Sequence, residues 1–213
     1  MLKLVVLVRR ADSVTHDQLV AHWRDVHMPN VIEHQRPDKY RVTFFEEGVD
    51  APFDGMAALW FQDDERARRL MSGDSSEKIP DDGFGALIHK PPVVLACEEY
   101  VPVDGPQPKD ALVVTGLVRR KPEIDPDVFF KSWLDDHVPN VAGALNKTPG
   151  GLRYVVSHAT RGGPDPAIAG IAEVYYTGRD AAKEHMGQLG PDNFMKYVRS
   201  PGFLNGYQVV GIE

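Results

Sequence analysis

The stretch HWRDVHMPNV, residues 22–31, returns as SWLDDHVPNV at residues 132–141. The two copies share Trp, Asp, His, Pro, Asn and Val at identical spacing. When residues 2–31 are laid over residues 112–141 without a gap, 12 positions are identical. The chain is therefore an internal duplication with an offset of 110 residues, and a repeat of this kind decides the architecture before any other pattern.

The duplication predicts two similar units, because 213 residues suffice for two units of about 100. We expect a first repeat at 1–101, a linker at 102–110 and a second repeat at 111–213. The linker segment is rich in Pro and charged residues, as domain boundaries often are. With 42% hydrophobic and 26% charged residues, the chain can bury a sizeable core.

Each repeat contains apolar runs that predict strands. The run at 2–8 is continuously apolar, which is typical of a strand buried on both faces, and its copy follows at 111–118. Arg41 and Arg153 are expected to be equivalent, with a two-residue insertion in the second repeat. The other strands are expected at 39–45, 55–61, 93–100, 152–156, 170–176 and 203–210.

The first helix of each repeat has a recognisable start. In the first repeat, Thr15 followed by Gln18 predicts a capping box, in which each side chain bonds the other residue's backbone N–H. In the second repeat, Asp125 followed by Pro126 is an equally good start, because proline at the first helical position loses no hydrogen bond. The first helix is thus expected at about 15–30.

The end of each helix is marked by proline. Pro29 and Pro139 disfavour a helical conformation of the residue before them, so each helix is expected to end or kink around His27 or His137.

Each repeat is then a β-α-β-β-α-β unit, a ferredoxin-like half. Two helices cover only one face of a four-stranded sheet, so each half would leave a sheet face open. Two copies in one chain can cover each other. The expected class is therefore α+β, with two ferredoxin-like repeats forming one pseudo-two-fold barrel.

Composition excludes several classes of protein. The net charge of −7 argues against nucleic-acid binding, which needs clustered Lys and Arg. No apolar run approaches the roughly 20 residues of a membrane span. The lone Cys97 cannot form an internal disulfide, which fits a cytoplasmic protein. His22 and His27 do not share a helical face, so we expect no metal site, and no motif predicts a cofactor.

These residues carry a resemblance to a known family. An apolar strand that ends in Arg, a helix with Trp four residues before His, and His-x-Pro at its end resemble the EthD family, named for ethyl tert-butyl ether degradation. Family members commonly have leucine after the proline, whereas Asn30 and Asn140 stand there in this chain. The resemblance extends through both repeats. It implies a tandem member of the dimeric α+β barrel superfamily, with both ferredoxin-like repeats in one chain.

The two motif histidines have two interpretations. As catalytic groups, His27 and His137 would transfer protons near neutral pH, taking one from a phenol or from a carbon next to a carbonyl. As structural groups, they would bond the carbonyl groups left over at the end of each helix. Repetition in both halves favours the structural role, because a structural need repeats whereas one active site often survives in one copy.

Other residues could bind a substrate. The aromatic side chains are expected to line a cleft or the core, and the arginines to hold an enolate or carboxylate oxygen. Pairing with acidic neighbours is the alternative for the arginines. The candidates are Trp23, Trp133, Arg9, Arg119, Tyr40, Tyr154 and Tyr175.

The leading functional hypothesis is a cofactor-free enzyme, a lyase, cyclase or isomerase. It would bind a small aromatic or polyketide-like molecule and use His27 or His137 as general acid and base for cyclisation, dehydration or isomerisation. The alternatives are a non-catalytic ligand-binding protein of a degradation pathway and a haem-dependent or other cofactor-dependent monooxygenase. Relatives by fold include polyketide cyclases and haem-degrading monooxygenases, so the fold does not choose. The pseudo-dimeric chain could also form a homodimer.

Overall fold

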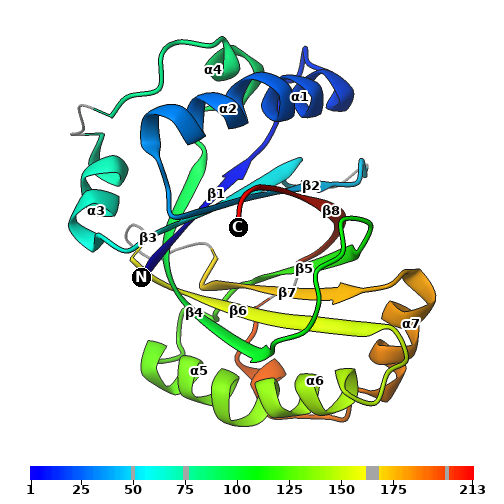
Figure 1. The fold of residues 1–213 in the computed structure, drawn as a ribbon. Helices are drawn as coiled ribbons and strands as arrows, with labels where there is room; N and C mark the ends of the chain where they lie inside the picture. The colour runs from blue at the N-terminus through cyan, green and yellow to red at the C-terminus, as the bar shows by residue number, and fades with distance from the viewer. Residues whose placement is uncertain (49–50, 74–76, 162–167, 200–201) are drawn as a thin grey trace. The chain divides into compact units, whose positions relative to one another are not determined.

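The two copies of the duplicated stretch lie in two compact units (Figure 1). Unit 1 comprises Met1–Cys97 and Gln208–Glu213, and unit 2 comprises Glu98–Tyr207. This computed structural model describes residues 1–48, 51–73, 77–161, 168–199 and 202–213. Strands β4 (Val93–Val103) and β8 (Gly202–Ile212) each contribute residues to both units. Strand β4 thus extends into the segment predicted as a linker.

Unit 1 holds an antiparallel sheet in the order β4-β1-β3-β2-β8. Strand β1 is the continuous apolar run that the sequence predicted at 2–8. Besides β4 and β8, its elements are β1 (Leu2–Val8), α1 (His16–His22), η1 (Trp23–His27), α2 (Met28–Asn30), η2 (Val31–Gln35), β2 (Lys39–Phe45), β3 (Gly55–Phe61), α3 (Asp64–Ser72) and α4 (Phe84–Leu87).

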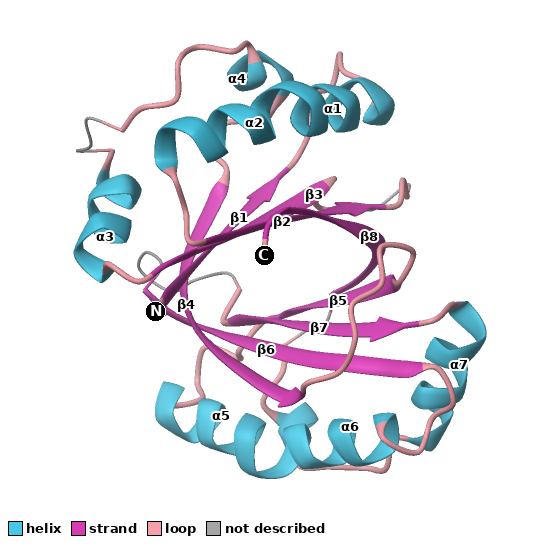
Figure 2. Cartoon of the chain, viewed as in Figure 1, coloured by secondary structure: helices cyan, strands magenta, loops and turns pink. Residues whose placement is uncertain are grey.

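Helices cover one face of this sheet (Figure 2). Leu4 lies opposite Leu59, which in turn lies opposite Tyr40, so the three side chains share a face. That face packs under Trp23 of the first helix in a single buried cluster. Burial of each large apolar side chain contributes about 1.5–3 kcal/mol, so this helix-covered face stabilises the unit substantially.

Unit 2 repeats the arrangement with the sheet order β8-β5-β7-β6-β4. Its helices again cover one sheet face (Figure 2), and Trp133 is again central to the buried cluster. The further elements are β5 (Leu112–Val118), α5 (Pro126–Ser132), η3 (Trp133–His137), α6 (Val138–Leu145), β6 (Gly151–Arg161), β7 (Gly170–Tyr176), α7 (Arg179–Gln188) and η4 (Phe194–Lys196).

The complete strand order, β1-β3-β2-β8-β5-β7-β6-β4, is that of a closed barrel. The expected mixture of helices with a closed antiparallel sheet is confirmed. The expected equivalence of Arg41 and Arg153 is wrong, because Arg41 pairs with Ala58 whereas the matching position in unit 2 is Val155. Four residues, not two, are inserted before β6, so Tyr40 and Tyr154 are the equivalent pair.

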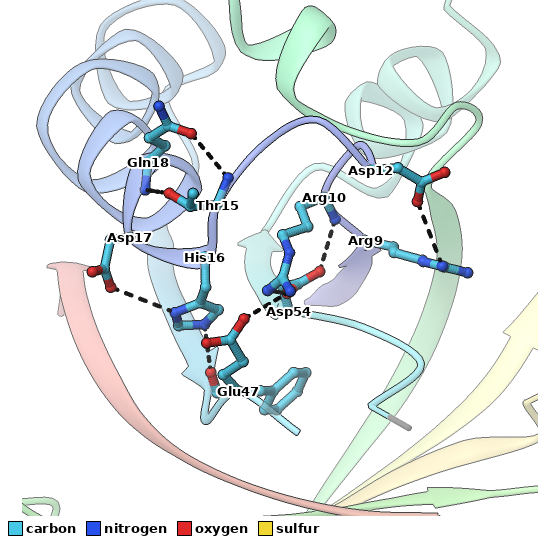
Figure 3. Close-up of polar contacts among 10 residues, drawn as sticks. Arg9, Arg10, Asp12, Thr15, His16, Asp17, Gln18, Glu47 and Asp54 are labelled. Carbon is cyan, nitrogen blue, oxygen red and sulfur yellow. Dashed lines mark hydrogen bonds and ion pairs between the residues drawn. The ribbon is translucent and has the colours of Figure 1, made fainter. Parts of the chain in front are cut away.

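The predicted helix starts are confirmed. Gln18 N–H donates to Thr15 Oγ1 at 3.2 Å and Thr15 N–H to Gln18 Oε1 at 2.9 Å, which completes the capping box (Figure 3). In unit 2, Asp125 Oδ1 accepts hydrogen bonds from the N–H groups of Asp127 and Val128. These side chains satisfy donors that the first helical turn leaves free.

Ion pairs connect Arg10, just after β1, to the segment between β2 and β3 (Figure 3). Arg10 donates from its backbone N–H and its guanidinium to Asp54, at 2.8 and 2.7 Å, and also to Glu47 at 2.8 Å. His16 bonds the carbonyl oxygen of Phe45 at 2.8 Å. The start of the first helix is thereby held against the loop between β2 and β3.

Of the two predicted outcomes, an end or a kink around the motif histidine, the end is wrong, because each helix continues past its proline. Each helix instead widens into a π-helical turn just before the proline. Met28 N–H bonds Trp23 O, and Val138 N–H bonds Trp133 O, five residues back in each case. Proline cannot donate to the helix, and the wider turn lets the chain continue past it. Each motif histidine is the last residue of such a turn, a feature that often occurs at functional sites.

Each motif tryptophan packs on a glycine. Gly55 pairs with Val8 at the end of β1, and Gly170 pairs with Val118 at the end of β5. A Cβ atom on either glycine would lie 2.8 Å from Cζ3 of Trp23 or Trp133. The glycine therefore lets the indole approach the sheet backbone closely.

We expect Gly55→Ala to lower the free energy of unfolding by about 1–3 kcal/mol, because the added methyl group would overlap Trp23. Gly143 in α6 is the control, since a Cβ atom there meets nothing within 4 Å. Gly143→Ala should stabilise the protein by about 0.5–1 kcal/mol. Urea denaturation measures both, and a Gly55→Ala variant as stable as the unmodified protein would contradict this packing.

Candidate functional site

Each motif histidine is bonded to an aspartate far along the chain. His27 Nδ1 lies 2.9 Å from Asp82 Oδ2, and Asn30 Nδ2 donates to the same oxygen at 3.0 Å. Unit 2 repeats this cluster, with His137 Nδ1 and Asn140 Nδ2 at 2.7 and 2.9 Å from Asp192 Oδ2. The asparagines that replace the family's usual leucine therefore have a role, which is to hold the carboxylate.

The hydrogen bonds decide which ring nitrogen carries the proton. An ionised carboxylate only accepts hydrogen bonds, so Nδ1 of each histidine must be the donor. In the neutral ring, Nε2 then has a free lone pair. This is how an aspartate orients a histidine that acts as a base.

The pKa values agree with this assignment. Burial would raise the pKa of Asp82, but hydrogen bonds from Asn30, the Phe84 N–H and His27 outweigh it and hold the pKa at about 2. Burial of Asp192 is likewise outweighed by His137 and Asn140, and its pKa is lowered. Burial lowers the pKa of His27, although Asp82 opposes the change. Near neutral pH the pair His27–Asp82 is thus a neutral ring beside a carboxylate.

Each imidazole also packs on a phenylalanine. The His27 ring stacks on Phe84 at 3.9 Å between centroids, and the His137 ring lies 4.8 Å from Phe194. The two histidine side chains remain 17% and 20% exposed.

In unit 2, His137 opens onto a cavity of about 440 Å³. The walls come from the helix-covered face of the sheet, from α6 and α7, and from the segment around η4. Most of the wall is apolar. It is formed by Val114, Gly116, Val118, His137, Asn140, Val141, Tyr154, Ala172, Val174, Tyr176, His185, Met186, Leu189, Gly190, Pro191, Asp192, Phe194, Met195, Val198 and Phe203.

Two tyrosines add polar groups to this wall. The hydroxyl of Tyr154 is buried and makes no hydrogen bond of standard geometry among the described residues, although the Trp133 indole N–H faces it. Burial raises the pKa of Tyr154, so its hydroxyl keeps its proton. Tyr176 Oη lies 2.5 Å from His185 Nδ1, and His185 Nε2 lies 3.1 Å from Val141 O.

Gly116 makes room in the wall. A Cβ atom on Gly116 would meet Phe203 Cε1 at 3.4 Å, on the cavity side of the sheet. The equivalent residue of unit 1 is Val6, because Val6 pairs with Ala57 as Gly116 pairs with Ala172. Unit 1 therefore has an isopropyl side chain at a position where unit 2 has no side chain.

The tyrosines predicted to bind substrate lie in three different environments. Tyr154 lines the cavity of unit 2 together with His137. Tyr40, its counterpart in unit 1, is buried beside the Trp23 indole N–H. Tyr175 lies on the opposite face of β7 from Tyr176, and its hydroxyl donates to Glu173 Oε1 at 3.2 Å.

The tryptophans and arginines lie elsewhere. Trp23 packs edge-on against Phe44, with ring centroids 5.6 Å apart, and Trp133 packs on Phe194 at 5.2 Å, so both belong to buried clusters. Arg9 is exposed and pairs with Asp12 at 3.8 Å (Figure 3). Arg119 lies beside Gly202, with Nη1 3.6 Å from where a Cβ atom would be.

The sequence interpretation missed Asp82, Asp192 and Tyr176. The first two were detectable, because Asp82 and Asp192 are separated by the same 110 residues as the motif histidines. Phe84 and Phe194 follow at the same offset. Tyr176 and His185 have no such signal, since neither has a like residue in the first repeat.

In the part of the chain that the structure describes, no three His, Cys, Asp or Glu side chains converge as metal ligands. None of the described helices has the length and apolar character needed to span a membrane.

Comparison with protein families places the first copy of the motif. Residues 11–83 match the family model of the EthD domain. The matched segment includes His27, Asn30 and Asp82, so the His–Asp–Asn cluster of unit 1 lies within the part of the chain that is similar to an EthD domain.

Solved structures share the fold. The chain aligns over 100% of its length with 94% of an anthrone oxidase-like protein, with 12% identity and a TM-score of 0.61. It aligns over 98% with 91% of a mutant chlorite dismutase from Candidatus Nitrospira defluvii, with 10% identity and a TM-score of 0.60. A proposed monooxygenase from Lactobacillus acidophilus NCFM aligns over 98% of this chain and 94% of its own, with 11% identity and a TM-score of 0.57. No curated protein matches the sequence.

We expect Asp82→Asn to lower the free energy of unfolding by about 1–2 kcal/mol at pH 7 and by little at pH 2. The pKa of Asp82 is about 2 in the folded state against an ordinary value of 3.8. The unfolded chain therefore binds the proton more readily, and the stabilisation, complete above about pH 4, is lost as pH falls towards 2.

Urea denaturation between pH 2 and 7 measures this effect. Asp81→Asn is the control, because Asp81 Oδ1 accepts a bond from Gly83 N–H that an Asn oxygen can also accept. A loss of stability in Asp82→Asn that is the same at every pH would contradict a role for the ionised carboxylate.

Proposed function

We propose that the cavity of unit 2 binds a small, partly apolar molecule of aromatic or polyketide-like type and that His137 transfers protons within it. The reaction class would be a cyclisation, dehydration or isomerisation without a cofactor. The observation that carries the proposal is a histidine oriented by a carboxylate at the wall of a largely apolar cavity of about 440 Å³.

The chemistry follows from the tautomer. Nε2 of His137 takes a proton from a carbon next to a carbonyl group, and the electron pair of the C–H bond moves into an enolate. The Asp192 carboxylate stabilises the imidazolium that forms. The imidazolium then returns the proton to carbon, to oxygen or to a departing hydroxide that leaves as water. Positioned proton transfer of this kind contributes about 10²–10⁴-fold to a rate.

Tyr154 is suited to stabilise the enolate oxygen. Its hydroxyl keeps its proton, is buried in the cavity wall and makes no hydrogen bond of standard geometry among the described residues. A donor aimed at a developing negative charge in an apolar site stabilises the transition state more than it does in water. Tyr154 would thus act as a hydrogen-bond donor beside the base His137.

The fold relatives support the choice of ligand class. One of them is named for anthrone, an aromatic ketone. We also infer that each unit is a ferredoxin-like repeat, which its β-α-β-β-α-β order and its sheet order support.

A second candidate is a ligand-binding protein without catalysis. The His–Asp–Asn cluster occurs in both units with nearly the same distances, as a structural fastening would. In that case the cluster joins the first helix of each unit to a distant loop, and the cavity of unit 2 only holds a ligand.

We expect His137→Gln to abolish catalysed proton exchange, whereas His27→Gln, the matched change in the other unit, leaves it unchanged. The assay is loss of the α-CH₂ signal of 1-tetralone and related aryl ketones in D₂O, followed by NMR. The expected loss in His137→Gln is about 10²–10⁴-fold. Exchange at the normal rate in His137→Gln would exclude this mechanism, and binding without exchange by the unmodified protein would favour the second candidate.

Gly116→Val should close the cavity while the protein stays folded. Valine fits the strand conformation and is the residue that unit 1 has at this position, Val6. The variant should lose most of its affinity for the aryl ketones, as measured by isothermal titration calorimetry. Its melting temperature is the control for folding, and unchanged affinity would show that ligands bind elsewhere.

A further inference from the structure

Tyr176 and His185 form a buried pair that the proposed proton transfer does not use. Their side chains are 2% and 1% exposed, and both residues line the cavity of unit 2. Tyr176 comes from β7 and His185 from α7. The pair is continued by the contact between His185 Nε2 and the carbonyl oxygen of Val141 in α6.

The direction of each hydrogen bond is fixed by this chain of contacts. A carbonyl oxygen can only accept, so His185 Nε2 must carry a proton and donate to Val141 O. Burial lowers the pKa of His185, against the opposing effect of Val141, so the ring stays neutral and Nδ1 has no proton. Tyr176 must therefore donate its hydroxyl proton to His185 Nδ1.

The consequence concerns the oxygen of Tyr176. Its only proton is committed to His185, and its remaining lone pairs can accept but not donate. A ligand group that meets Tyr176 in the cavity must then supply its own proton. A hydroxyl group satisfies this oxygen, whereas a carbonyl or ether oxygen would leave two acceptors facing each other, which costs free energy in a buried site.

Unit 1 lacks this pair. Phe61 occupies the position of Tyr176, since Leu2 pairs with Phe61 as Leu112 pairs with Tyr176. His185 lies seven residues after Gly178, the residue that caps α7, and the residue seven after the matching cap Asp63 is Leu70. Leu70 packs against the core of unit 1. The Tyr176–His185 pair thus occurs in unit 2, which contains the cavity, and not in unit 1. The His–Asp–Asn cluster occurs in both units.

We propose that Tyr176, held by His185, is a specificity-determining acceptor that selects a neutral ligand bearing a phenol or enol hydroxyl. The proposal rests on the ligand cavity of the proposed function and names its substrate class more closely. Asp192 supplies a negative charge to the same wall, which disfavours an anionic ligand. The hydroxyl would donate to Tyr176 Oη, and the rest of the molecule would contact the apolar wall that includes Val174 and Phe203.

The test compares two probes that differ by one proton donor, 1-naphthol and 1-methoxynaphthalene. The unmodified protein should bind 1-naphthol more tightly. Tyr176→Phe, which copies Phe61 and should fold, should weaken 1-naphthol binding about three- to tenfold, the loss of one neutral hydrogen bond. Its affinity for 1-methoxynaphthalene should not fall. Isothermal titration calorimetry measures all four affinities.

A second variant changes the direction of the hydrogen bond and keeps the tyrosine. His185→Leu, which copies Leu70, releases the Tyr176 proton, so the hydroxyl can then donate to an ether oxygen. The preference for 1-naphthol over 1-methoxynaphthalene should shrink because the ether gains affinity. Tyr197→Phe is the control for loss of a phenol group in unit 2, because Tyr197 does not line the cavity.

Equal preference in Tyr176→Phe and the unmodified protein would overturn the proposal, as would an unmodified protein that binds the two probes equally. His137→Gln separates this outcome from failure of the proposed function. If His137→Gln abolishes proton exchange but keeps the preference for 1-naphthol, the two roles are distinct. If exchange persists in His137→Gln while Tyr176→Phe loses the preference, the hydroxyl subsite stands and the proton-transfer mechanism fails.

Discussion

Much of the structure of each unit depends on the hydrogen bond between the histidine that ends the π-helical turn and an aspartate 55 residues further along the chain. It joins the π-helical turn to the segment that precedes the last strand. It also brings Phe84 or Phe194 against the histidine ring, so the same contact packs the core and fixes the tautomer. Because the aspartate is ionised and also accepts a hydrogen bond from the neighbouring Asn, each histidine donates from Nδ1, and its Nε2 carries no proton when the ring is neutral. Structural and chemical roles therefore reside in the same side chains.

The sequence predicted what depends on local patterns. Strands at 2–8, 39–45, 55–61 and 170–176 were correct to the residue, because continuous apolar runs with turn residues on each side are local signals. The contacts of Asp82 and Asp192 were missed because local patterns do not reveal a partner 55 residues away, although the 110-residue offset of the two aspartates repeats that of the motif histidines. The π-helical turns were missed because a proline predicts a lost hydrogen bond but not how the helix accommodates it. Tyr175 was chosen where Tyr176 lines the cavity, and only the strand register separates neighbours that point to opposite faces.

The two units differ in the apolar side chains that they have at matching positions. At matching positions, unit 1 has Val6, Phe61 and Leu70, whereas unit 2 has Gly116, Tyr176 and His185. Each change towards unit 2 removes apolar volume or adds a polar group, which costs stability in a core. The Tyr176–His185–Val141 contacts offset part of that cost by satisfying one another. Unit 1, which has the apolar residues, can supply stability while the residues of unit 2 vary.

The assignment of residues 208–213 to unit 1 has a consequence for the order in which the protein is made. Strand β8 pairs with β2 in unit 1, yet the ribosome synthesises β8 only after every residue of unit 2. The N-terminal unit therefore emerges first but completes its sheet last. Until then the edge of β2 has no partner strand, a surface that can pair with other chains. During synthesis, the vulnerable part of this protein is the half that has been outside the ribosome longest.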